Sequence, residues 1–325
     1  MPSSRATATA TPVLVVTRLD DATADLVINE LHQREVPVVR LDPGDFPDGL
    51  RLTAFLDGHS LTGVALTATR TADLAGIRSV YWRRPTAYVT GPGQVEQWCA
   101  DQARYGLGGV LAALPGAHYV NHPWRNRDAE HKPVQLAVAA RCGLRIPPTL
   151  ITNDLDEARR FAEQHRPVLY KPLWNSPYVG PDNRPLTIWV DDVPPDSLDA
   201  GVSRTAHLFQ QRVDKAADVR LTVVGQRLFA VRVDSPGLDW RRTYDHNSYT
   251  LINTPADVAH AVRAYLDTFD LVYGAFDFGI DHTGQWWMYE CNPNGQWAWF
   301  PGHITAPITD ALADQLQHSG EPRER

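Results

Sequence analysis

The stretch GAFDFGIDHTGQWWMYECNPNG, residues 274–295, decides how this chain folds. Its two β-type runs, residues 274–281 and 285–292, are joined by the short segment HTG, which is typical of a β-hairpin. Glu290 lies inside the second run among aromatic residues, where an unpaired charge would be costly. The position of Glu290 therefore requires a positive partner or a bound cation.

The expected register of this hairpin brings two carboxylates together. A two-residue turn at Thr283-Gly284 would pair Asp277 with Glu290 on one face, with Cβ atoms ~5 Å apart. Asn292 lies two residues beyond Glu290 and shares that face. Three oxygen ligands of this kind suit Mg²⁺, which usually completes its coordination with phosphate oxygens of a substrate. The pattern favours a magnesium site, and the alternative is a solvated pair of carboxylates on an exposed hairpin.

Composition limits the possible function. The 325 residues include 43% apolar residues, enough for two or three domains with hydrophobic cores. A net charge of −7 argues against nucleic-acid binding. The three cysteines lack the spacing of a zinc site or a disulfide framework. No long apolar run indicates a membrane span, the N-terminus lacks the apolar core of a signal peptide, and the expected compartment is the cytoplasm.

The first third of the chain has the pattern of an α/β domain. Residues 12–18 and 36–42 are typical of strands, and residues 21–35 between them have helical spacing. This β-α-β order predicts a parallel sheet with ligand sites near the carboxyl ends of its strands. Further expected elements are a hairpin at 52–70, a strand at 79–85, a helix at 93–114 and a strand at 117–123.

The remaining chain divides into two further parts. Composition changes near Asn121, and residues 174–200 are Pro-rich and irregular apart from the strand-like run LTIWV (186–190). Expected elements are a helix at 132–143, a strand at 166–173, strands at 207–213, 218–225 and 227–234, a helix at 255–269, and the final hairpin. We predict domains at 1–118, 119–206 and 207–325.

Cations precede the acidic hairpin along the chain. Lys171 lies in the strand VLYKPL, and Lys132 stands just before a helix start, which can hold an anion. The alternative for Lys171 is a strand-end lysine whose amine reaches solvent. Arg220 and Arg232 lie on successive strands and could both face one cleft. Since no Walker A motif is present, a nucleotide would be held by side chains and strand backbone.

Taken together, Lys132, PVLYKP, FQQRV, DVRLTVVG and the final hairpin resemble the ATP-grasp ligases over residues 120–300. The resemblance implies an α/β ATP-grasp fold with an N-terminal pre-ATP-grasp α/β domain, a central α+β domain and a C-terminal ATP-grasp domain. It also implies a role for each matching residue: Lys132, Lys171, Arg220 and Arg232 on the ATP phosphates, Gln211, Arg212 and Val213 at adenine, Asp218 at ribose, and Asp277, Glu290 and Asn292 on two Mg²⁺ ions.

A closer resemblance is to the ATP-grasp maturases of ribosomally made, side-chain-cyclised peptides, and it rests on YWRRP, NHPWRNRDAEHKP, DWRR and ECNPNGQW. It implies an enzyme that phosphorylates an Asp or Glu side chain of a precursor peptide and forms an ω-ester or ω-amide ring. The implied partner is a precursor with a leader and an acidic core, and we expect a homodimer without nucleic-acid or membrane partners. The loop after Lys171 departs from the superfamily, since it has few glycines.

The resemblance also suggests where the peptide binds. Arg241 in DWRR is the candidate for the substrate carboxylate or acyl phosphate, unless it pairs with Asp239 or Asp245. Arg83 or Arg84 is expected to contact the acidic core. The segment 186–190 is the candidate surface for the leader.

Two other classes of protein remain possible. A ligase of free amino acids or short peptides, similar to glutathione synthetase, would share the ATP residues and need a compact substrate pocket. A non-catalytic ATP-binding protein should have lost metal ligands, yet all three candidate ligands are present.

Overall fold

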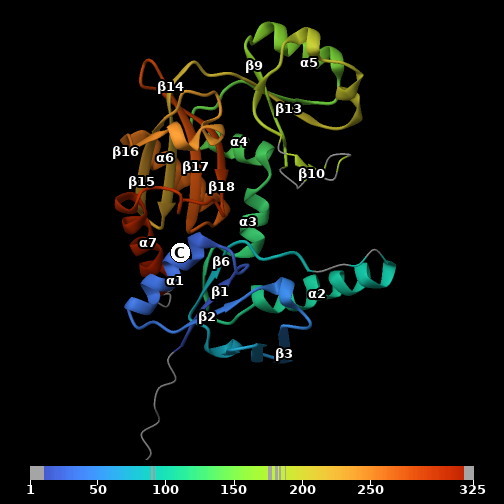
Figure 1. Cartoon of the computed structure of the whole chain (residues 1–325), viewed down its shortest axis with the longest axis vertical. Helices are drawn as coiled ribbons and strands as arrows, with labels where there is room; N and C mark the ends of the chain where they lie inside the picture. Colours follow the sequence, from blue (N-terminus) through green and yellow to red (C-terminus); the bar gives the residue numbers. More distant parts are fainter. Residues whose placement is uncertain are drawn as a thin grey trace, which may run out of the picture.

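This computed structural model describes residues 11–88, 91, 93–174, 178–179, 182, 184–186 and 188–317. The chain forms three main β-sheets that are stacked along its long axis, with the N-terminal sheet and the central sheet at opposite ends (Figure 1). The C-terminal sheet lies between them, so residues from the last hairpin can face both neighbours. Among the described residues, no helix has the length and apolar content needed to cross a bilayer.

The N-terminal sheet confirms the predicted β-α-β start. It contains β1 (Val13–Val16), β2 (Val38–Leu41), β6 (Ser79–Trp82) and β7 (His118–Val120), all parallel, in the order β2-β1-β6-β7. All four residues of β1 are buried, because helices cover both faces of a parallel sheet. The remaining elements here are α1 (Ala22–Gln33), α2 (Gln94–Ala112), η1 (Pro43–Asp45), η2 (Leu74–Gly76), and the small sheet of β3 (Leu50–Asp57), β4 (Ser60–Thr67) and β5 (Thr71–Asp73).

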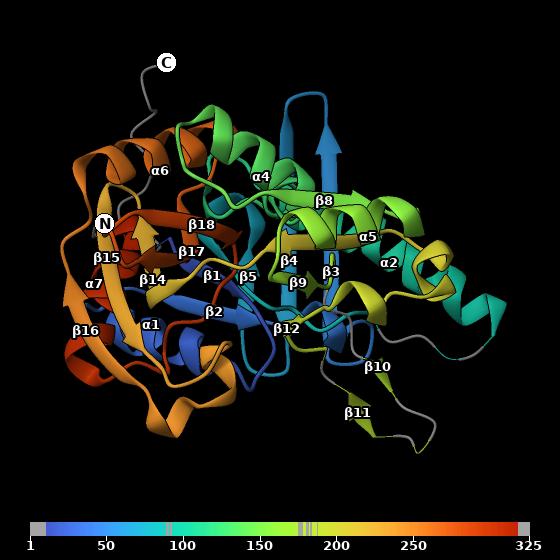
Figure 2. The same cartoon turned by 90° about the horizontal axis from the view of Figure 1, so that it is seen from above.

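The central sheet is antiparallel, in the order β12-β9-β13-β8. Its strands are β8 (Thr149–Thr152), β9 (Val168–Lys171), β12 (Asp191–Asp192) and β13 (His207–Gln211). One face packs on α5 (Leu155–Gln164), which lies against this sheet in Figure 2. Ala158 and Ala162 of α5 belong to the same buried cluster as Phe209 of β13. Near it lie β10 (Tyr178–Val179), β11 (Pro185–Leu186), η3 (Pro195–Ser197) and η4 (Ala200–Arg204).

The C-terminal sheet is also antiparallel, in the order β16-β15-β14-β17-β18. Its strands are β14 (Lys215–Val224), β15 (Arg227–Asp234), β16 (Ser248–Ile252), β17 (Tyr273–Asp281) and β18 (Trp286–Asn292). One face packs on α6 (Ala256–Phe269), beside α3 (Pro123–Ala129) and α4 (Lys132–Arg141). The other face packs on α7 (Gly302–Gln317), which also contacts α1 and so joins the C-terminal and N-terminal domains.

These pairings move both predicted domain boundaries. Strand β7 pairs with β6, so the N-terminal sheet extends to Val120 and not to 118. Helices α3 and α4 pack on the C-terminal sheet instead of the central one. Strand β13 pairs with β8 and β9, so the central sheet extends to Gln211 and not to 206.

The segment 186–190 does not form the single expected strand. Leu186 ends β11, Thr187 lies outside the described residues, and 188–190 has no strand geometry. The side chain of Ile188 is exposed.

Candidate active site

The last hairpin has a three-residue loop where a two-residue turn was expected. The backbone N–H of Asp281 donates to the carbonyl of Gln285 at 3.0 Å, and Gly284 takes a positive φ of 86° between them. This loop pairs Phe278 with Met288, one residue out of the predicted register. A bulge at Tyr289 then adds one residue to β18, and Asp277 pairs with Glu290 after all. The predicted pair is therefore confirmed although the predicted turn is wrong.

The bulge also gives Tyr289 a function in packing. Its ring crosses Gly279, where a Cβ atom would collide with the Tyr289 hydroxyl. The ammonium of Lys171 lies 4.4 Å from the centre of the same ring. The bulge thus places an aromatic surface beside the buried lysine.

Asp277, Glu290 and Asn292 converge as the sequence predicts. The Asn292 amide donates to Asp277 Oδ2 at 3.3 Å and to Glu290 Oε1 at 3.2 Å. Lys132 Nζ lies 3.3 Å from Glu290 Oε2 and donates to the carbonyl of Pro172 at 2.7 Å. The cluster is therefore partnered by cations and is not a solvated pair on an exposed hairpin.

The electrostatics favour an ionised Glu290. Burial alone would raise its pKa, but the positive charges of Lys132 and Lys171 outweigh that effect and hold the pKa below its usual value. Burial raises the pKa of Asp277, against the lowering effect of Arg220. An ionised Glu290 carboxylate is an oxygen ligand of the kind that a divalent cation binds.

The three side chains fit a magnesium ion that completes its coordination with phosphate oxygens. Two carboxylates and one amide supply oxygen ligands, and Mg²⁺ is usually bound by one or two carboxylates plus substrate phosphates. Within the described part of the chain, no group of three His, Cys, Asp or Glu side chains forms a metal cage. The residues present therefore suit a metal that arrives with a nucleotide.

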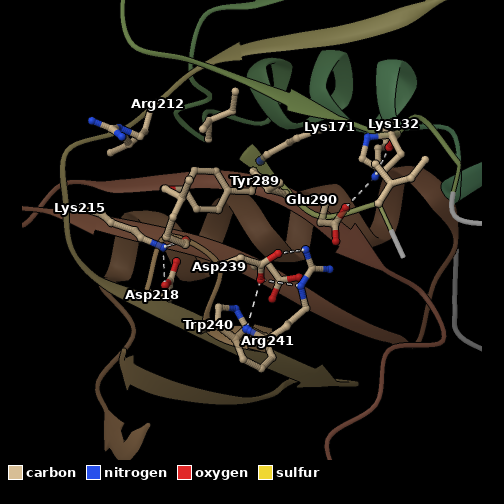
Figure 3. Close-up of a pocket in the computed structure, with 17 residues that line it drawn as sticks. Lys132, Lys171, Arg212, Lys215, Asp218, Asp239, Trp240, Arg241, Tyr289 and Glu290 are labelled. Atoms are coloured by element: carbon tan, nitrogen blue, oxygen red, sulfur yellow. Dashed lines mark hydrogen bonds and ion pairs between the residues drawn. The ribbon is translucent and has the colours of Figure 1, made fainter. Parts of the chain in front are cut away.

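A cavity between the central and C-terminal sheets lies next to these residues (Figure 3). Lys171 of β9 reaches it from the central sheet, and burial lowers the pKa of Lys171 to about 8. Asp218 of β14 reaches it from the opposite side, and burial raises the pKa of Asp218 to about 6. Lys215, which the sequence analysis did not select, binds Asp218 Oδ2 at 2.5 Å. Arg212 and Val213 line the same cavity, as expected for a hinge.

In β13, the side chain of Gln210 and not that of Gln211 lies on the face toward the cavity. Gln210 pairs with the cavity-lining Leu169, whereas Gln211 pairs with Val168 on the face that packs against α5. The Gln210 side chain accepts from Lys171 Nζ at 2.7 Å and donates to Thr149 Oγ1 at 2.9 Å. The expected contact of the Gln211 side chain with adenine is therefore corrected, because the sequence shows two adjacent glutamines and not the face of each.

The two strand arginines face opposite sides of the sheet. Arg220 pairs across the sheet with Asp277, and its Nη1 donates to both carboxylate oxygens at 2.8 and 2.9 Å. Arg232 pairs with Val219, whose side chain packs toward α6, and Arg232 binds Asp234 at 2.8 Å. The expectation that both face one cleft is wrong, because the hairpin register separates them by one residue.

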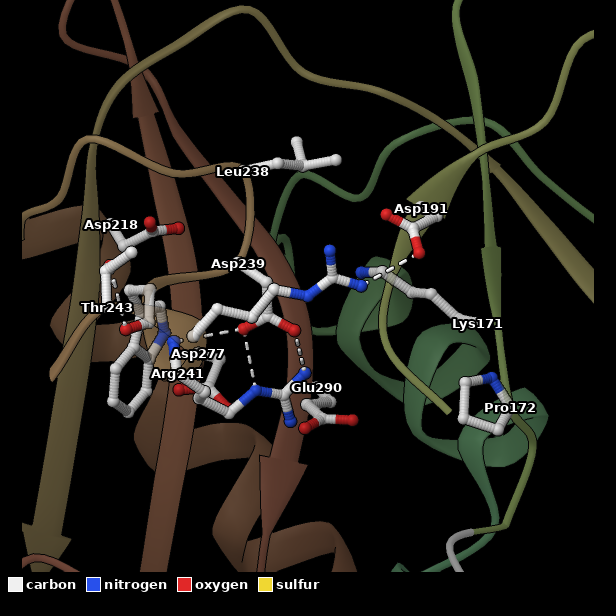
Figure 4. Close-up of polar contacts among 12 residues, drawn as sticks. Lys171, Pro172, Asp191, Asp218, Leu238, Asp239, Arg241, Thr243, Asp277 and Glu290 are labelled. Carbon is white, nitrogen blue, oxygen red and sulfur yellow. Dashed lines mark hydrogen bonds and ion pairs between the residues drawn. The ribbon is translucent and has the colours of Figure 1, made fainter. Parts of the chain in front are cut away.

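Arg241 pairs with Asp239, one of the two partners considered from the sequence. Its Nε and Nη2 donate to the two Asp239 oxygens, each at 2.8 Å. The pair nevertheless lies in the cavity wall beside Glu290 (Figure 4), and the positive charge of Arg241 helps to lower the pKa of Glu290. Arg241 is therefore both paired with Asp239 and part of the cavity wall.

A second, larger hollow opens between the N-terminal and C-terminal domains, with a volume of about 1040 Å³. Arg83 and Arg84 both line it. The guanidinium of Arg83 is buried, binds Asp21 at 3.2 Å and donates to the carbonyl of Gly295, while Arg84 is exposed. Of the two, Arg84 is the one available to a ligand. Lys132 and Glu290 line both this groove and the smaller cavity.

Comparison with known proteins gives matches at both the domain and the whole-chain level. Residues 12–127 match the family model described as the MvdD pre-ATP grasp domain. The macrocyclase MdnC from Microcystis aeruginosa MRC, solved with precursor peptide MdnA, is 25% identical with a TM-score of 0.85. The match covers 95% of this chain and 100% of that chain. The macrocyclase MdnB of the same organism is 25% identical with a TM-score of 0.78, over 94% and 99% of the two chains. The chain has the fold of these ATP-grasp macrocyclases over almost its whole length.

A further solved ligase has the same fold over almost its entire length. The RiPP-associated ATP-grasp ligase of Chryseobacterium gregarium, solved with ADP and a leader and core peptide, is 23% identical with a TM-score of 0.88. The match covers 97% of this chain and 99% of that chain. No match was found among the curated proteins. The predicted ATP-grasp fold and the predicted resemblance to peptide-maturing ATP-grasp ligases are confirmed.

Proposed function

We propose that this protein is an ATP-grasp ligase that uses ATP to activate Asp or Glu side chains of a ribosomal precursor peptide and closes ω-ester or ω-amide rings. One observation carries the proposal. Glu290 and Lys132 line both the cavity between the sheets and the groove between the domains. A nucleotide phosphate in the cavity and a peptide carboxylate in the groove would therefore meet at the same two residues.

The chemistry requires a better leaving group than oxide. A carboxylate oxygen of the peptide attacks the γ-phosphorus of ATP, ADP leaves, and an acyl phosphate forms. A Ser/Thr hydroxyl or a Lys amine of the same peptide then attacks the acyl carbon and loses its proton, and inorganic phosphate leaves. The peptide loses one water in total, and ATP becomes ADP and phosphate.

The protein contributes alignment and charge neutralisation. Lys132 and Lys171 would contact the phosphates, and Arg241 would contact the substrate carboxylate or acyl phosphate through its planar fork. Asp277, Glu290 and Asn292 would hold two Mg²⁺ ions. Bound magnesium would neutralise charge that develops on the phosphoryl oxygens.

The environment of the cavity supports these roles. Burial makes the charged form of Lys171 costly, and an anionic phosphate would restore that charge. Lys215 and Asp218 lie at the far side of the cavity, where Asp218 would meet ribose. Arg212 and Val213 would contact adenine through the backbone. Arg232 lies on the other face of the sheet and would not contact the nucleotide.

The peptide would bind in two places. Its acidic core would lie in the groove, where Arg84 is exposed and Arg127 and Lys132 add positive charge. Its leader would bind the central domain near 186–190, where Ile188 and Trp189 are partly exposed. The homodimer and the cytoplasmic compartment stay predictions, and the mass of the ligase in solution tests the first.

The alternative function is ligation of free amino acids or short peptides. Such an enzyme would need a compact substrate pocket, whereas this groove has a volume of about 1040 Å³ and is open. The size of the groove therefore favours a peptide substrate.

The direct test is incubation with ATP, Mg²⁺ and a candidate precursor. The probe is the short peptide, rich in Thr and Asp/Glu, that we expect to be encoded beside this ligase. Mass spectrometry should show the loss of one water mass per ring, dependent on ATP. Ligation of free amino acids without any change to the peptide would favour the alternative function.

A further inference from the structure

The connection between β15 and β16, residues 235–247, forms a strap along the cavity. Its residues Leu238, Asp239, Trp240 and Arg241 line the cavity. The strap is held together internally, since Asn247 Nδ2 donates to the Trp240 carbonyl at 2.8 Å and the Ser235 and Thr243 hydroxyls lie 2.8 Å apart. It should therefore move as one piece.

One side chain of the strap reaches across to the central domain. Arg242 Nη2 donates to Asp191 Oδ2 on β12 at 2.8 Å. Asp191 is labelled in Figure 4, where a dashed line marks this contact. The Arg242 guanidinium also lies 5.2 Å from the centre of the Trp189 ring. Two residues of the central domain thus hold the strap in place from the opposite wall of the cavity.

The cavity is smaller in this arrangement than most ligand sites. Its volume is about 90 Å³, whereas sites for small organic ligands measure roughly 300–1,000 Å³. Because the strap and the central sheet form two of its walls, a nucleotide can enter when they separate. The contacts of Arg242 oppose that separation.

We propose that Arg242 is a positioning residue that latches the strap to Asp191 and Trp189 and so holds the nucleotide cavity closed. The proposal rests on the proposed nucleotide site. Arg242 does not line the cavity, so it would act through its neighbours Trp240 and Arg241. The ion pair is partly exposed, with side-chain exposures of 38% for Arg242 and 65% for Asp191, so its effect should be modest and sensitive to salt.

The test measures how fast a bound nucleotide leaves. A fluorescent ADP analogue is bound with Mg²⁺ and displaced by excess ATP in a stopped-flow instrument. Arg242→Met and Asp191→Asn should each raise the dissociation rate by about 3- to 10-fold. The double variant should be no faster than Arg242→Met, because both changes break one latch. Arg160→Met is the matched control, since it breaks the exposed Arg160–Glu157 pair on α5, and it should leave the rate unchanged.

Salt dependence supplies a second readout. Near 1 M salt, where the screening length falls to about 3 Å, the wild-type rate should approach that of Asp191→Asn. Unchanged rates in both single variants, or additive effects in the double variant, would overturn the latch while the proposed function stands. Failure of the wild-type ligase to bind the analogue at all would overturn the latch together with the proposed function.

Discussion

Replacing Glu290 with Gln tests the acidic hairpin most sharply, because the change keeps the shape and removes the charge. Glu290 lies 3.3 Å from Lys132 and directly opposite Asp277. If magnesium and phosphate meet there, loss of this carboxylate should lower turnover by about 10²–10³, or roughly 3–4 kcal/mol of transition-state stabilisation.

The same substitution should change stability far less. Attraction to Lys132 at 3.3 Å amounts to roughly 5 kcal/mol at an effective dielectric constant of 20, before desolvation is subtracted. Repulsion from Asp277 on the paired strand and the cost of burying the charge oppose this attraction. The effects offset each other in part, so the folded Glu290→Gln ligase should lose far less in stability than in turnover.

The assay combines turnover with thermal unfolding. Asp281→Asn provides the contrasting variant, because Asp281 accepts from Gln285 N at 3.0 Å and Trp287 Nε1 at 2.8 Å in the hairpin loop, away from the cavity. It should lower Tm while turnover of the folded ligase stays near normal. A folded Glu290→Gln ligase with near-normal turnover would refute the assignment of Glu290 as a metal ligand.

Three further predictions concern the nucleotide and the peptide. Burial lowers the pKa of Lys171 to about 8, so nucleotide affinity should be constant below pH 8. Above pH 8 the affinity should fall about tenfold per pH unit, because Lys171 must then gain a proton on binding. Lys171→Arg should abolish this slope in an affinity titration. Gln210→Leu removes the acceptor of the Lys171 ammonium, so the fall in nucleotide affinity should begin at lower pH. Gln211→Leu on the opposite face should leave the titration unchanged. Equal effects of the two variants would contradict the observed strand faces. Arg241→Ala should lower turnover and spare leader binding. Replacement of residues 186–190 should weaken leader binding strongly and change nucleotide binding only by the few-fold expected from losing the Trp189 contact of the latch. Labelled leader peptide and ADP distinguish the two, and the reverse pattern would exchange the two sites.

The elements that carry strong local patterns could be predicted from the sequence. Strand β1 and helix α1 were recognised from their apolar spacing, and the last hairpin from its two runs around a turn. Helix α7 was not predicted, since Pro307 lies inside it and proline disfavours helix interiors. Its buried residues Ile304 and Ile308 nevertheless join the core that connects the N-terminal and C-terminal domains.

The positions of the candidate site residues could be predicted where residue type was decisive, but not where strand register was decisive. Asp277, Glu290 and Asn292 converge because a bulge offsets the longer loop, which no sequence pattern indicated. Arg232 and Gln211 were misplaced because a one-residue difference in a strand reverses the face. Lys215 was missed because only the fold shows that its ammonium binds Asp218 at the cavity.

The central claim is that a peptide carboxylate passes through an acyl phosphate. The most direct measurement follows ¹⁸O from the Asp and Glu side-chain carboxyls of the candidate precursor during reaction with ATP. The account predicts that each ring closed releases one phosphate carrying one ¹⁸O atom, while the second ¹⁸O stays in the ester or amide carbonyl. Ring closure with all released phosphate unlabelled would contradict the acyl phosphate and, with it, the proposed function.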